Sequence, residues 1–421
     1  MAKDSRFFLN FTYFLIITAF FGTKLFTINL GPIQLSIFRV LLVVATCFFF
    51  KNHKSISNRY GNRYYRFLTI WVLYSLIMIV SVIDFGNFLR YFIFLFSAFI
   101  VSYYASYYFT KVEQYVKVLR WFEIIAVVFA AIGIYELVTG DYHFVQENSA
   151  IFYEERSMMM STLGIRIPMS VFGNPNDFGL FLLFSFYCSL ALLYIKNNFL
   201  GKILSASLAI LFAFLIVSTQ SRAVFMSLLG GITLWLIFDF KTWRPQIKAV
   251  FVVVLLLLIS SIIGWLMANE ELYMALISAD EESDDARINL IKYGFVVLGD
   301  TYLLGTNIGN VEAHMAHYAM YTNNVENIHN WWMEVLVSSG VIIFAFYIIL
   351  YARQIFFYYK NYNKTRNYTI NRISQAFLCF MITFVLGSIT ASSVFMTEWM
   401  WTVFAVIFAF PEVYKQKNQI S

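Results

Sequence analysis

Residues 200–240 read LGKILSASLAILFAFLIVSTQSRAVFMSLLGGITLWLIFDF. Two apolar runs, 200–219 and 223–240, are separated by only a few polar residues. Each has about the length of helix, ~20 residues, that crosses a bilayer. Lipid excludes irregular backbone, and such runs are too long for the strands of a membrane barrel. This stretch therefore predicts two membrane helices joined by a tight outer turn.

The whole chain has the composition of an integral membrane protein. Of its 421 residues, 60% are hydrophobic and 13% are charged, whereas about a quarter of the residues in a soluble domain are charged. The other runs of spanning length are 8–22, 33–50, 64–83, 88–109, 118–139, 176–196, 247–267, 331–353, 375–395 and 399–413. We therefore predict an all-α fold: residues 1–421 form a single transmembrane domain, a bundle of about twelve transmembrane helices.

The distribution of positive charge predicts the topology of this bundle. All but eight of the 30 Lys and Arg fall in one alternating set of connections and in the two termini. The positive-inside rule places these segments, and both termini, in the cytoplasm. The net charge of +6 is thus a topology signal, and it gives no reason to expect nucleic acid as a partner. Segments 140–175 and 268–330 become outer loops, the second of them a large extracytoplasmic loop between the ninth and tenth spans.

Within the large outer loop, residues 286–298 have the pattern of an amphipathic helix. Ile288, Ile291, Phe295 and Leu298 recur at helical spacing, which predicts a helix lying on the membrane surface. The same loop contains His314 and His317, but no third metal ligand is evident beside them. We therefore predict neither a metal nor any other cofactor.

The cations expected outside the cytoplasm are mostly arginine, namely Arg39, Arg90, Arg156, Arg166, Arg222 and Arg287. Guanidinium groups bind phosphate and carboxylate through two parallel hydrogen bonds. Arg39 and Arg90 could equally reach lipid headgroups. Arg222 differs because it lies in the tight turn of residues 218–222, and an ionisable group so close to the bilayer core is a candidate functional group.

Two further polar stretches begin predicted spans. Asn174, Pro175 and Asn176 form a turn and a helix start, whose free N–H groups attract anions; they could also be a helix cap and nothing more. His329 and Asn330 come directly before the span at 331–353. A histidine there could act as a general base near neutral pH, or could be an interfacial polar residue.

Taken together, these stretches resemble the O-antigen ligase and polysaccharide polymerase superfamily of bacterial envelope glycosyltransferases. The residues that carry the resemblance are Arg166, Gly173–Asn176, Thr219–Arg222, Arg287, Leu304–Gly305, Gly309–Asn310, His329–Asn330 and Glu334. The resemblance implies a C-type glycosyltransferase in the bacterial cytoplasmic membrane with its active face outside. Such an enzyme transfers a glycan from undecaprenyl pyrophosphate to an acceptor hydroxyl without a metal.

The resemblance also implies roles for individual residues. Arg222 and Arg287 would stabilise the pyrophosphate leaving group, and His329 would accept the proton of the attacking hydroxyl. Substrate-binding roles fall to Arg166, Asn174, Asn176, Asn330 and Glu334, with Asn330 or Glu334 orienting the imidazole. The expected partners are the lipid-linked donor, a glycan acceptor, the bilayer and a chain-length regulator.

The resemblance leaves two activities open. A polymerase joins repeat units on the lipid carrier, whereas a ligase moves the finished glycan to a lipid A core or another acceptor. The Asn-Pro-Asn-Asp sequence at residues 174–177 favours the polymerase. A third reading, a lipid-linked glycan flippase, would be expected to show inverted repeats and polar groups near the membrane midplane. Here the charges gather at the outer ends of the spans.

Overall fold

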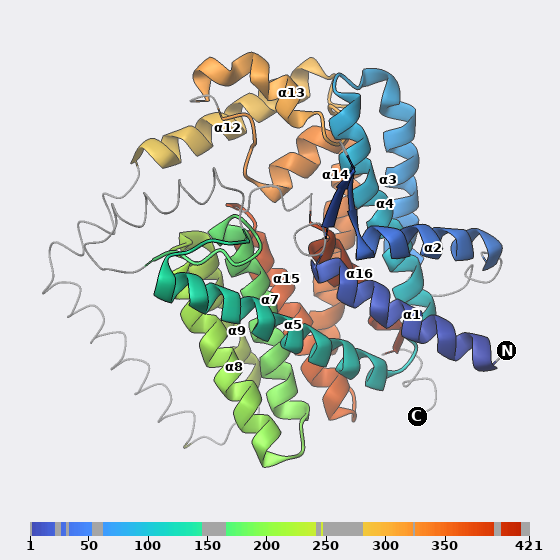
Figure 1. The fold of residues 1–421 in the computed structure, drawn as a ribbon, viewed down its shortest axis with the longest axis vertical. Coiled ribbons are helices and arrows are strands. Elements are labelled where there is room, and N and C mark those ends of the chain that lie inside the picture. Colours follow the sequence, from blue (N-terminus) through green and yellow to red (C-terminus); the bar gives the residue numbers. More distant parts are fainter. Residues whose placement is uncertain are drawn as a thin grey trace, which may run out of the picture.

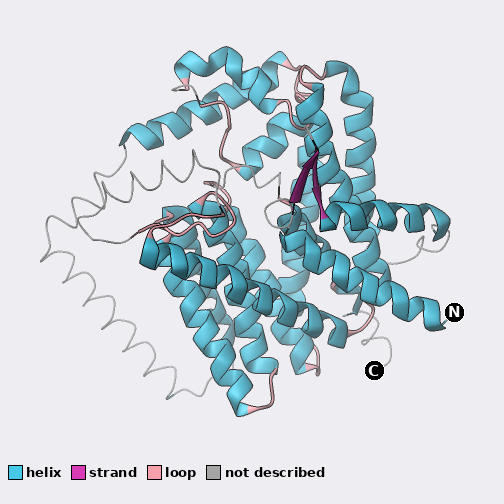
Figure 2. Cartoon of the chain, in the orientation of Figure 1, coloured by secondary structure: helices cyan, strands magenta, loops and turns pink. Residues whose placement is uncertain are grey.

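A computed structural model describes residues 2–21, 27–30, 33–52, 62–144, 166–240, 246, 281–322, 325–390 and 397–413. Within these ranges the protein is a bundle of helices, with one short pair of strands (Figure 2). The helices of the first half are α1 (Ala2–Phe21), α2 (Ile37–Asn52), α3 (Asn62–Ile77), α4 (Phe85–Tyr108), α5 (Val112–Thr139), α7 (Pro175–Ile195), α8 (Phe199–Ser218) and α9 (Arg222–Phe240). Those of the second half are α12 (Glu281–Asp300), α13 (Val311–Met315), α14 (Trp331–Asn361), α15 (Tyr368–Gly387) and α16 (Glu398–Ala409). The 3₁₀ helices η2 (Met78–Ser81) and η4 (Ala316–Tyr321) follow α3 and α13.

The expectation of a multi-pass membrane protein is met. In the described part of the chain, eight helices are long and apolar enough to cross a membrane: α3 with η2, α4, α5, α7, α8, α9, α14 and α15. Helices α1, α2 and α16 coincide with three further expected spans but are not among these eight: α2 and α16 are shorter, and the apolar helix within α1 is Arg6–Phe21. The span expected at 247–267 lies outside the described residues. The side of the membrane that each end faces stays a prediction.

The second expected span begins later than its hydropathy indicated. Residues 33–36 form strand β2 (Ile33–Ser36), which pairs antiparallel with β1 (Thr27–Leu30). Their backbone hydrogen bonds therefore go to the neighbouring strand, and helix α2 starts only at Ile37. Hydropathy averaged over a span of about 20 residues does not resolve a strand of four residues at its start.

Polar side chains define where several helices begin. Asp84, Asn174, Asn330 and Asn367 each precede a helix and accept a hydrogen bond from a backbone N–H of its first turn. These caps satisfy donors that would otherwise lack partners. In the case of α7, Pro175 at the first position reinforces the start, because its fixed φ suits a helix.

Buried ion pairs join helices at the end of the bundle where α7 and α9 finish. Lys196 Nζ donates to Glu123 Oε2 on α5 at 2.9 Å, and to Ser205 Oγ on α8 at 2.7 Å. Arg372 on α15 donates to Asp239 Oδ1 on α9 at 2.5 Å. All four charged side chains are almost entirely buried in the bundle.

Helices α12 and α13 lie across the opposite end, above the start of α14 (Figure 1). The helix predicted at 286–298 is confirmed as part of α12, but only half of its expected apolar face is packed. Ile288 and Phe295 are exposed, whereas Leu298 is buried and Ile291 packs against the buried cluster of Leu290, Val297 and Val337. The apolar spacing predicted the helix correctly but did not reveal which apolar residues face the bundle.

Candidate active site

Helix α14, which begins at the candidate site, is interrupted at its tenth residue. Gly340 has φ 74° and ψ 171°, outside the helical region. The loop before α13 fills this break: Thr306 N–H donates to Val337 carbonyl at 2.9 Å, and Val341 N–H donates to Leu303 carbonyl at 3.0 Å. The first part of α14, residues 331–339, is therefore held by the loop of residues 301–310 as well as by its own hydrogen bonds.

The same loop is fastened to the hairpin of α3 and α4. Asn310 Oδ1 accepts the backbone N–H groups of Ile83 and Asp84 at 2.9 and 2.8 Å. Asn307 Nδ2 donates to the Ser75 carbonyl at 2.9 Å. The Leu304–Gly305 and Gly309–Asn310 stretches, which contributed to the family resemblance, thus belong to a loop with a structural role. Its Asn307 and Asn310 side chains attach it to the hairpin of α3 and α4.

His329 lies in the segment that leads into α14 and has an uncommon backbone conformation. Its φ is 53°, a region in which residues other than glycine are infrequent and in which functional residues are often found. The His329 N–H donates to Asn327 Oδ1 at 2.8 Å, and the Asn327 Nδ2 donates to Glu312 Oε1 at 2.8 Å. One amide side chain therefore holds the histidine backbone on one side and a carboxylate of α13 on the other.

The surroundings of His329 favour its neutral form. Burial lowers the pKa of the imidazole below its usual value, and the positive charge of Arg287 on α12 lowers it further. Both effects act against the imidazolium cation. Two residues predicted to be catalytic, His329 and Arg287, are thus brought close enough to interact electrostatically.

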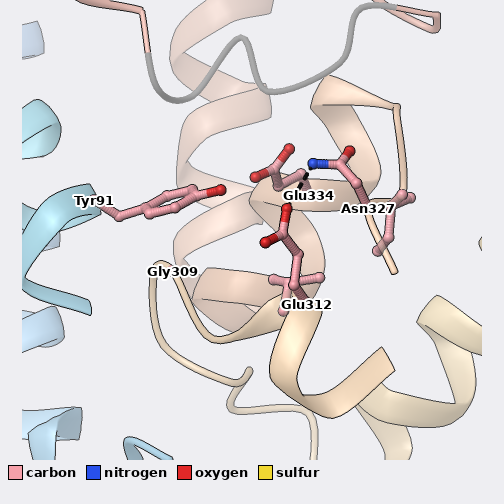
Figure 3. A pocket seen from close by; sticks show the side chains of 7 residues that line it. Tyr91, Gly309, Glu312, Asn327 and Glu334 are labelled. Atoms are coloured by element: carbon pink, nitrogen blue, oxygen red, sulfur yellow. Dashed lines mark hydrogen bonds between the residues drawn. The ribbon is translucent and has the colours of Figure 1, made fainter. Parts of the chain in front are cut away.

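A small pocket opens beside this segment (Figure 3). It is lined by Tyr91, Gly309, Val311, Glu312, Asn327, Ile328 and Glu334. Tyr91 comes from α4, Glu312 from α13 and Glu334 from the first turns of α14, and their polar ends point toward one another. The charges of Glu312 and Glu334 both act on the Tyr91 hydroxyl.

Asn330 and Glu334 flank the start of α14 with different contacts. Asn330 Oδ1 accepts from the backbone of Trp332 and Met333 at 3.0 and 3.2 Å, so it caps the helix. Glu334 is 6% exposed and points into the pocket. In the described part of the chain neither side chain is hydrogen-bonded to the imidazole, so the expectation that one of them orients the ring stays a prediction.

The starts of α7 and α9 lie at this same end of the bundle. Gly387, the last residue of α15, packs against Leu180 of α7 and Ser227 of α9, and the following Ser388 carbonyl accepts the Trp331 N–H at 3.1 Å. Asp177 of α7 also lies near enough to Glu334 for their charges to interact. Asn174, Asn176 and Arg222 therefore begin helices around the same end as His329.

At these helix starts, Asn174 is a helix cap and Arg222 is exposed. Asn174 Oδ1 accepts the Asn176 N–H at 2.8 Å, which caps α7. Arg222 is exposed at the first position of α9, two residues after Gln220, whose φ is 55°. The turn therefore presents a guanidinium group at the rim of the bundle.

Arg166 is held at the end of α5. Its Nη1 donates to the Val138 carbonyl at 2.5 Å, where a cation complements the C-terminal end of a helix. The following residues are held by Glu136, whose Oε2 accepts the N–H groups of Met169 and Ser170, both at 2.7 Å. Arg166 has further donors that could reach a substrate, so its predicted binding role stays open.

Arg39 lies inside the bundle, with a protein carboxylate as its neighbour. Its Nε is 3.7 Å from Glu398 Oε1 of α16, and the guanidinium lies 5.5 Å from the centre of the Phe94 ring. A lipid headgroup is therefore not needed to explain this arginine. Arg156 lies outside the described residues.

Three polar residues that line the pocket were not expected from the sequence, namely Tyr91, Glu312 and Asn327. Tyr91 lies within an apolar span of ordinary appearance, and its role depends on how α4 packs against α14. The one signal present was the Asn327-Ile328-His329-Asn330 sequence, in which a second asparagine stands two residues before the histidine. Such a spacing suits a side-chain-to-backbone hydrogen bond.

Comparison with known proteins finds a family model that matches part of the chain. The sequence model of the O-antigen ligase family matches residues 207–348. The match includes Arg222, Arg287, His329 and Glu334.

One curated relative aligns along nearly the whole chain. It is the teichuronic acid biosynthesis protein TuaE of Bacillus subtilis (strain 168), which is 28% identical over 436 residues. The alignment covers 99% of this chain and 86% of the relative. The family resemblance expected from the sequence is thereby confirmed.

Proposed function

We propose that this protein is a polysaccharide polymerase that joins undecaprenyl-pyrophosphate-linked repeat units at the outer face of the cytoplasmic membrane. The observation that carries the proposal is the placement of neutral His329 beside the fixed positive charge of Arg287, with Arg222 at the same end of the bundle. The relative that takes part in teichuronic acid biosynthesis supports a cell-envelope polysaccharide as the product.

The proposed reaction uses these groups in a simple way. The acceptor hydroxyl oxygen forms a bond to the anomeric carbon of the donor glycan, and the bond from that carbon to the phosphate oxygen breaks. The electron pair of the broken bond stays with the pyrophosphate, which gains negative charge. Arg222 and Arg287 stabilise this charge as it develops.

His329 accepts the proton of the attacking hydroxyl and later releases it to solvent. An imidazole can do this only in its neutral form, and the lowered pKa keeps His329 neutral at pH 7. The Asn327 hydrogen bond to its backbone fixes the position of the histidine relative to the start of α14. The acid–base balance of this step requires no cofactor.

A ligase is the second candidate, because the matched family is described as O-antigen ligase. Deleting the gene and analysing the lipid-linked glycans separates the two activities. Single repeat units that accumulate on the carrier would support the polymerase, whereas long unattached chains would support the ligase. Restoring the gene with a His329→Ala substitution, at equal expression, should reproduce the deletion phenotype.

A further inference from the structure

The segment that leads into α7 is buried although it is not helical. Residues 167–172 are all buried, and they form neither helix nor strand. The backbone N–H groups of such a segment need partners, because a buried N–H without one is costly. Glu136 on α5 is the partner of two of them: its Oε2 accepts the N–H groups of Met169 and Ser170, both at 2.7 Å. One carboxyl oxygen therefore replaces hydrogen bonds that a helix would have given this segment.

The Glu136 side chain makes these contacts from a fully enclosed position. It is 1% exposed, and among the described residues its other oxygen, Oε1, has no hydrogen-bond partner. Burying a carboxyl group is unfavourable unless hydrogen bonds compensate for its lost hydration. The compensating bonds described here all go to one short stretch of backbone, which points to a role in holding that stretch.

The backbone that Glu136 holds forms a strained turn. Ser170 has a φ of 52°, which is unfavourable for a residue with a side chain. The Phe172 N–H closes the turn on the Met169 carbonyl at 3.1 Å, and Ser170 Oγ donates to the Phe129 carbonyl of α5 at 2.9 Å. Such a conformation persists only where its surroundings fix it. Glu136 contributes to this because it binds the N–H groups of both Met169 and Ser170.

Arg166 stands at the start of the same segment, and its position depends on the backbone that follows. Its side chain is exposed, and its Nη1 donates to the Val138 carbonyl. A single hydrogen bond exposed to water holds a side chain weakly, because water competes for both partners. The buried contacts are those of the backbone: the Tyr142 hydroxyl donates to the Ile167 carbonyl at 2.9 Å, and Glu136 holds the segment two and three residues further on.

We infer that Glu136 is a positioning residue of the donor site, which fixes this segment so that Arg166 can bind the pyrophosphate of the lipid-linked donor. A guanidinium has five N–H donors, and the contact with Val138 uses one of them. The inference rests on the proposed function, in which the donor carries a pyrophosphate. Glu136 does not touch the substrate, because it is buried and its hydrogen bonds go to the protein backbone; it acts through Arg166.

The test is a double-mutant cycle in the full-length protein, purified in detergent. The donor is the lipid-linked repeat unit, and the acceptor is the repeat-unit oligosaccharide on a simple alkyl group, which cannot itself donate. Arg166→Ala and Glu136→Ala should each raise the donor KM about tenfold, as expected for the loss of one hydrogen bond to a charged group. The kcat should change by less than about threefold, because the other arginines and His329 remain in place.

The double variant separates positioning from a general loss of stability. If Glu136 acts through Arg166, Glu136→Ala combined with Arg166→Ala should raise the donor KM no more than about threefold beyond either single variant. Independent effects would multiply to roughly a hundredfold and would overturn the inference. So would a wild-type donor KM in either single variant.

Two further variants serve as controls. Glu136→Gln should stay within about threefold of the wild-type donor KM, because the amide oxygen can still accept both N–H groups. A Gln variant as impaired as Glu136→Ala would contradict the described hydrogen bonds. Glu113→Ala is the matched control, since Glu113 is exposed in the first turn of α5, at the other end of the same helix.

Amide hydrogen exchange over residues 166–172 gives a readout that needs no turnover. Exchange should be faster in Glu136→Ala than in wild type and unchanged in Glu113→Ala; unchanged exchange in Glu136→Ala would reject the inference. If Glu136→Ala did not fold, Glu136→Asp would replace it, because the shorter side chain withdraws the carboxyl group from the two N–H groups. Wild-type exchange and donor KM in that variant would reject the inference equally.

The inference and the proposed function can fail separately. If wild type transferred no glycan, the proposed function would be wrong. Faster exchange in Glu136→Ala, together with weaker binding of undecaprenyl pyrophosphate, would still support the positioning role. If wild type transferred glycan while Glu136→Ala kept the wild-type donor KM, the proposed function would stand and the inference would fall.

Discussion

Gly305 lies directly against the backbone of Gly340. A Cβ atom on Gly305 would be 2.5 Å from the Gly340 nitrogen, and one on Gly340 would be 2.3 Å from the Leu304 carbonyl oxygen. Both glycines also have positive φ, 88° and 74°. The loop of residues 301–310 can therefore enter the break in α14 only because neither residue carries a side chain.

Replacing Gly305 by alanine should destabilise the protein and reduce activity. The left-handed conformation alone costs an L-residue roughly 1–2 kcal/mol, and the contact with Gly340 adds to this. A clearly lowered Tm of the purified protein would be the expected result. Gly299→Ala is the control, because a Cβ there would meet nothing within 4 Å; equal Tm values for the two variants would contradict the proposed packing.

Arg222→Lys and Arg287→Lys should each keep the fold and lose most activity. Lysine retains the charge but cannot reproduce the paired hydrogen bonds of a guanidinium. Loss of one transition-state donor costs ~3 kcal/mol, or roughly a hundredfold in rate. Turnover of the lipid-linked repeat unit is the measurement, with Lys292→Gln on α12 as the control because Lys292 is exposed. Wild-type turnover by the Arg222→Lys protein would show that this arginine has no part in catalysis.

His329→Gln should bind donor normally and turn over slowly. A general base contributes ~100-fold to ten-thousandfold to the rate, while donor binding depends on the arginines. The kcat should fall by such a factor with donor Kd nearly unchanged, and chelator should have no effect on wild type. If a chelator abolished turnover, the general-base mechanism would have to be replaced by one involving His314 and His317.

Activity of wild type should fall as pH drops below about 6.5, the usual pKa of histidine, because His329 must be neutral. The folded-state pKa is lowered, so the fall should be centred below this value. In Arg287→Gln a positive charge is removed, the imidazolium is less disfavoured, and the pKa of His329 should rise. NMR titration with ¹³C-labelled histidine would measure it, the resonance being assigned by its loss in His329→Gln. A lower His329 pKa in Arg287→Gln than in wild type would contradict the placement of Arg287 near the imidazole.

The expected topology can be tested with two cysteines at opposite ends of α14. Ser283 is part of α12, which lies over the start of α14, and Asn363 follows its end. A membrane-impermeant reagent added outside intact cells should modify Ser283→Cys and miss Asn363→Cys, in a background without Cys47, Cys188 and Cys379. The reverse labelling would invert the topology and place the site in the cytoplasm.

Much of the architecture was predictable because lipid allows few structures. Long apolar runs such as 176–196 and 200–219 correspond to helices α7 and α8 within a few residues, since backbone groups in a membrane must bond within the helix. The strand pair before α2 was not predicted. Residues 33–36, Ile-Gln-Leu-Ser, alternate apolar and polar side chains, but so short an alternation is hidden when hydropathy is averaged over a whole span. The break at Gly340 was hidden for a similar reason: glycine is common in membrane helices.

The candidate site was predictable only in part. Arg287 and His329 could be selected because a charged group and a histidine stand out near apolar spans, and the structure brings them together. The pocket could not be predicted, because Tyr91, Glu312 and Glu334 come from three separate helices, α4, α13 and α14. No local pattern carries the information that these elements meet.

Two buried ion pairs, at the end of the bundle opposite the candidate site, also fix how the helices are aligned along their axes. Arg372 and Asp239 join α15 to α9, and Lys196 and Glu123 join the end of α7 to α5. If one of these helices slipped along its neighbour by a single turn, ~5.4 Å, it would leave charges unpaired in apolar surroundings, and breaking a buried pair is strongly destabilising. Apolar contacts alone would tolerate such sliding more readily. The starts of α7 and α9, with Asn176 and Arg222, are thus held in register with α5 and α15 by ion pairs at the opposite end of the bundle.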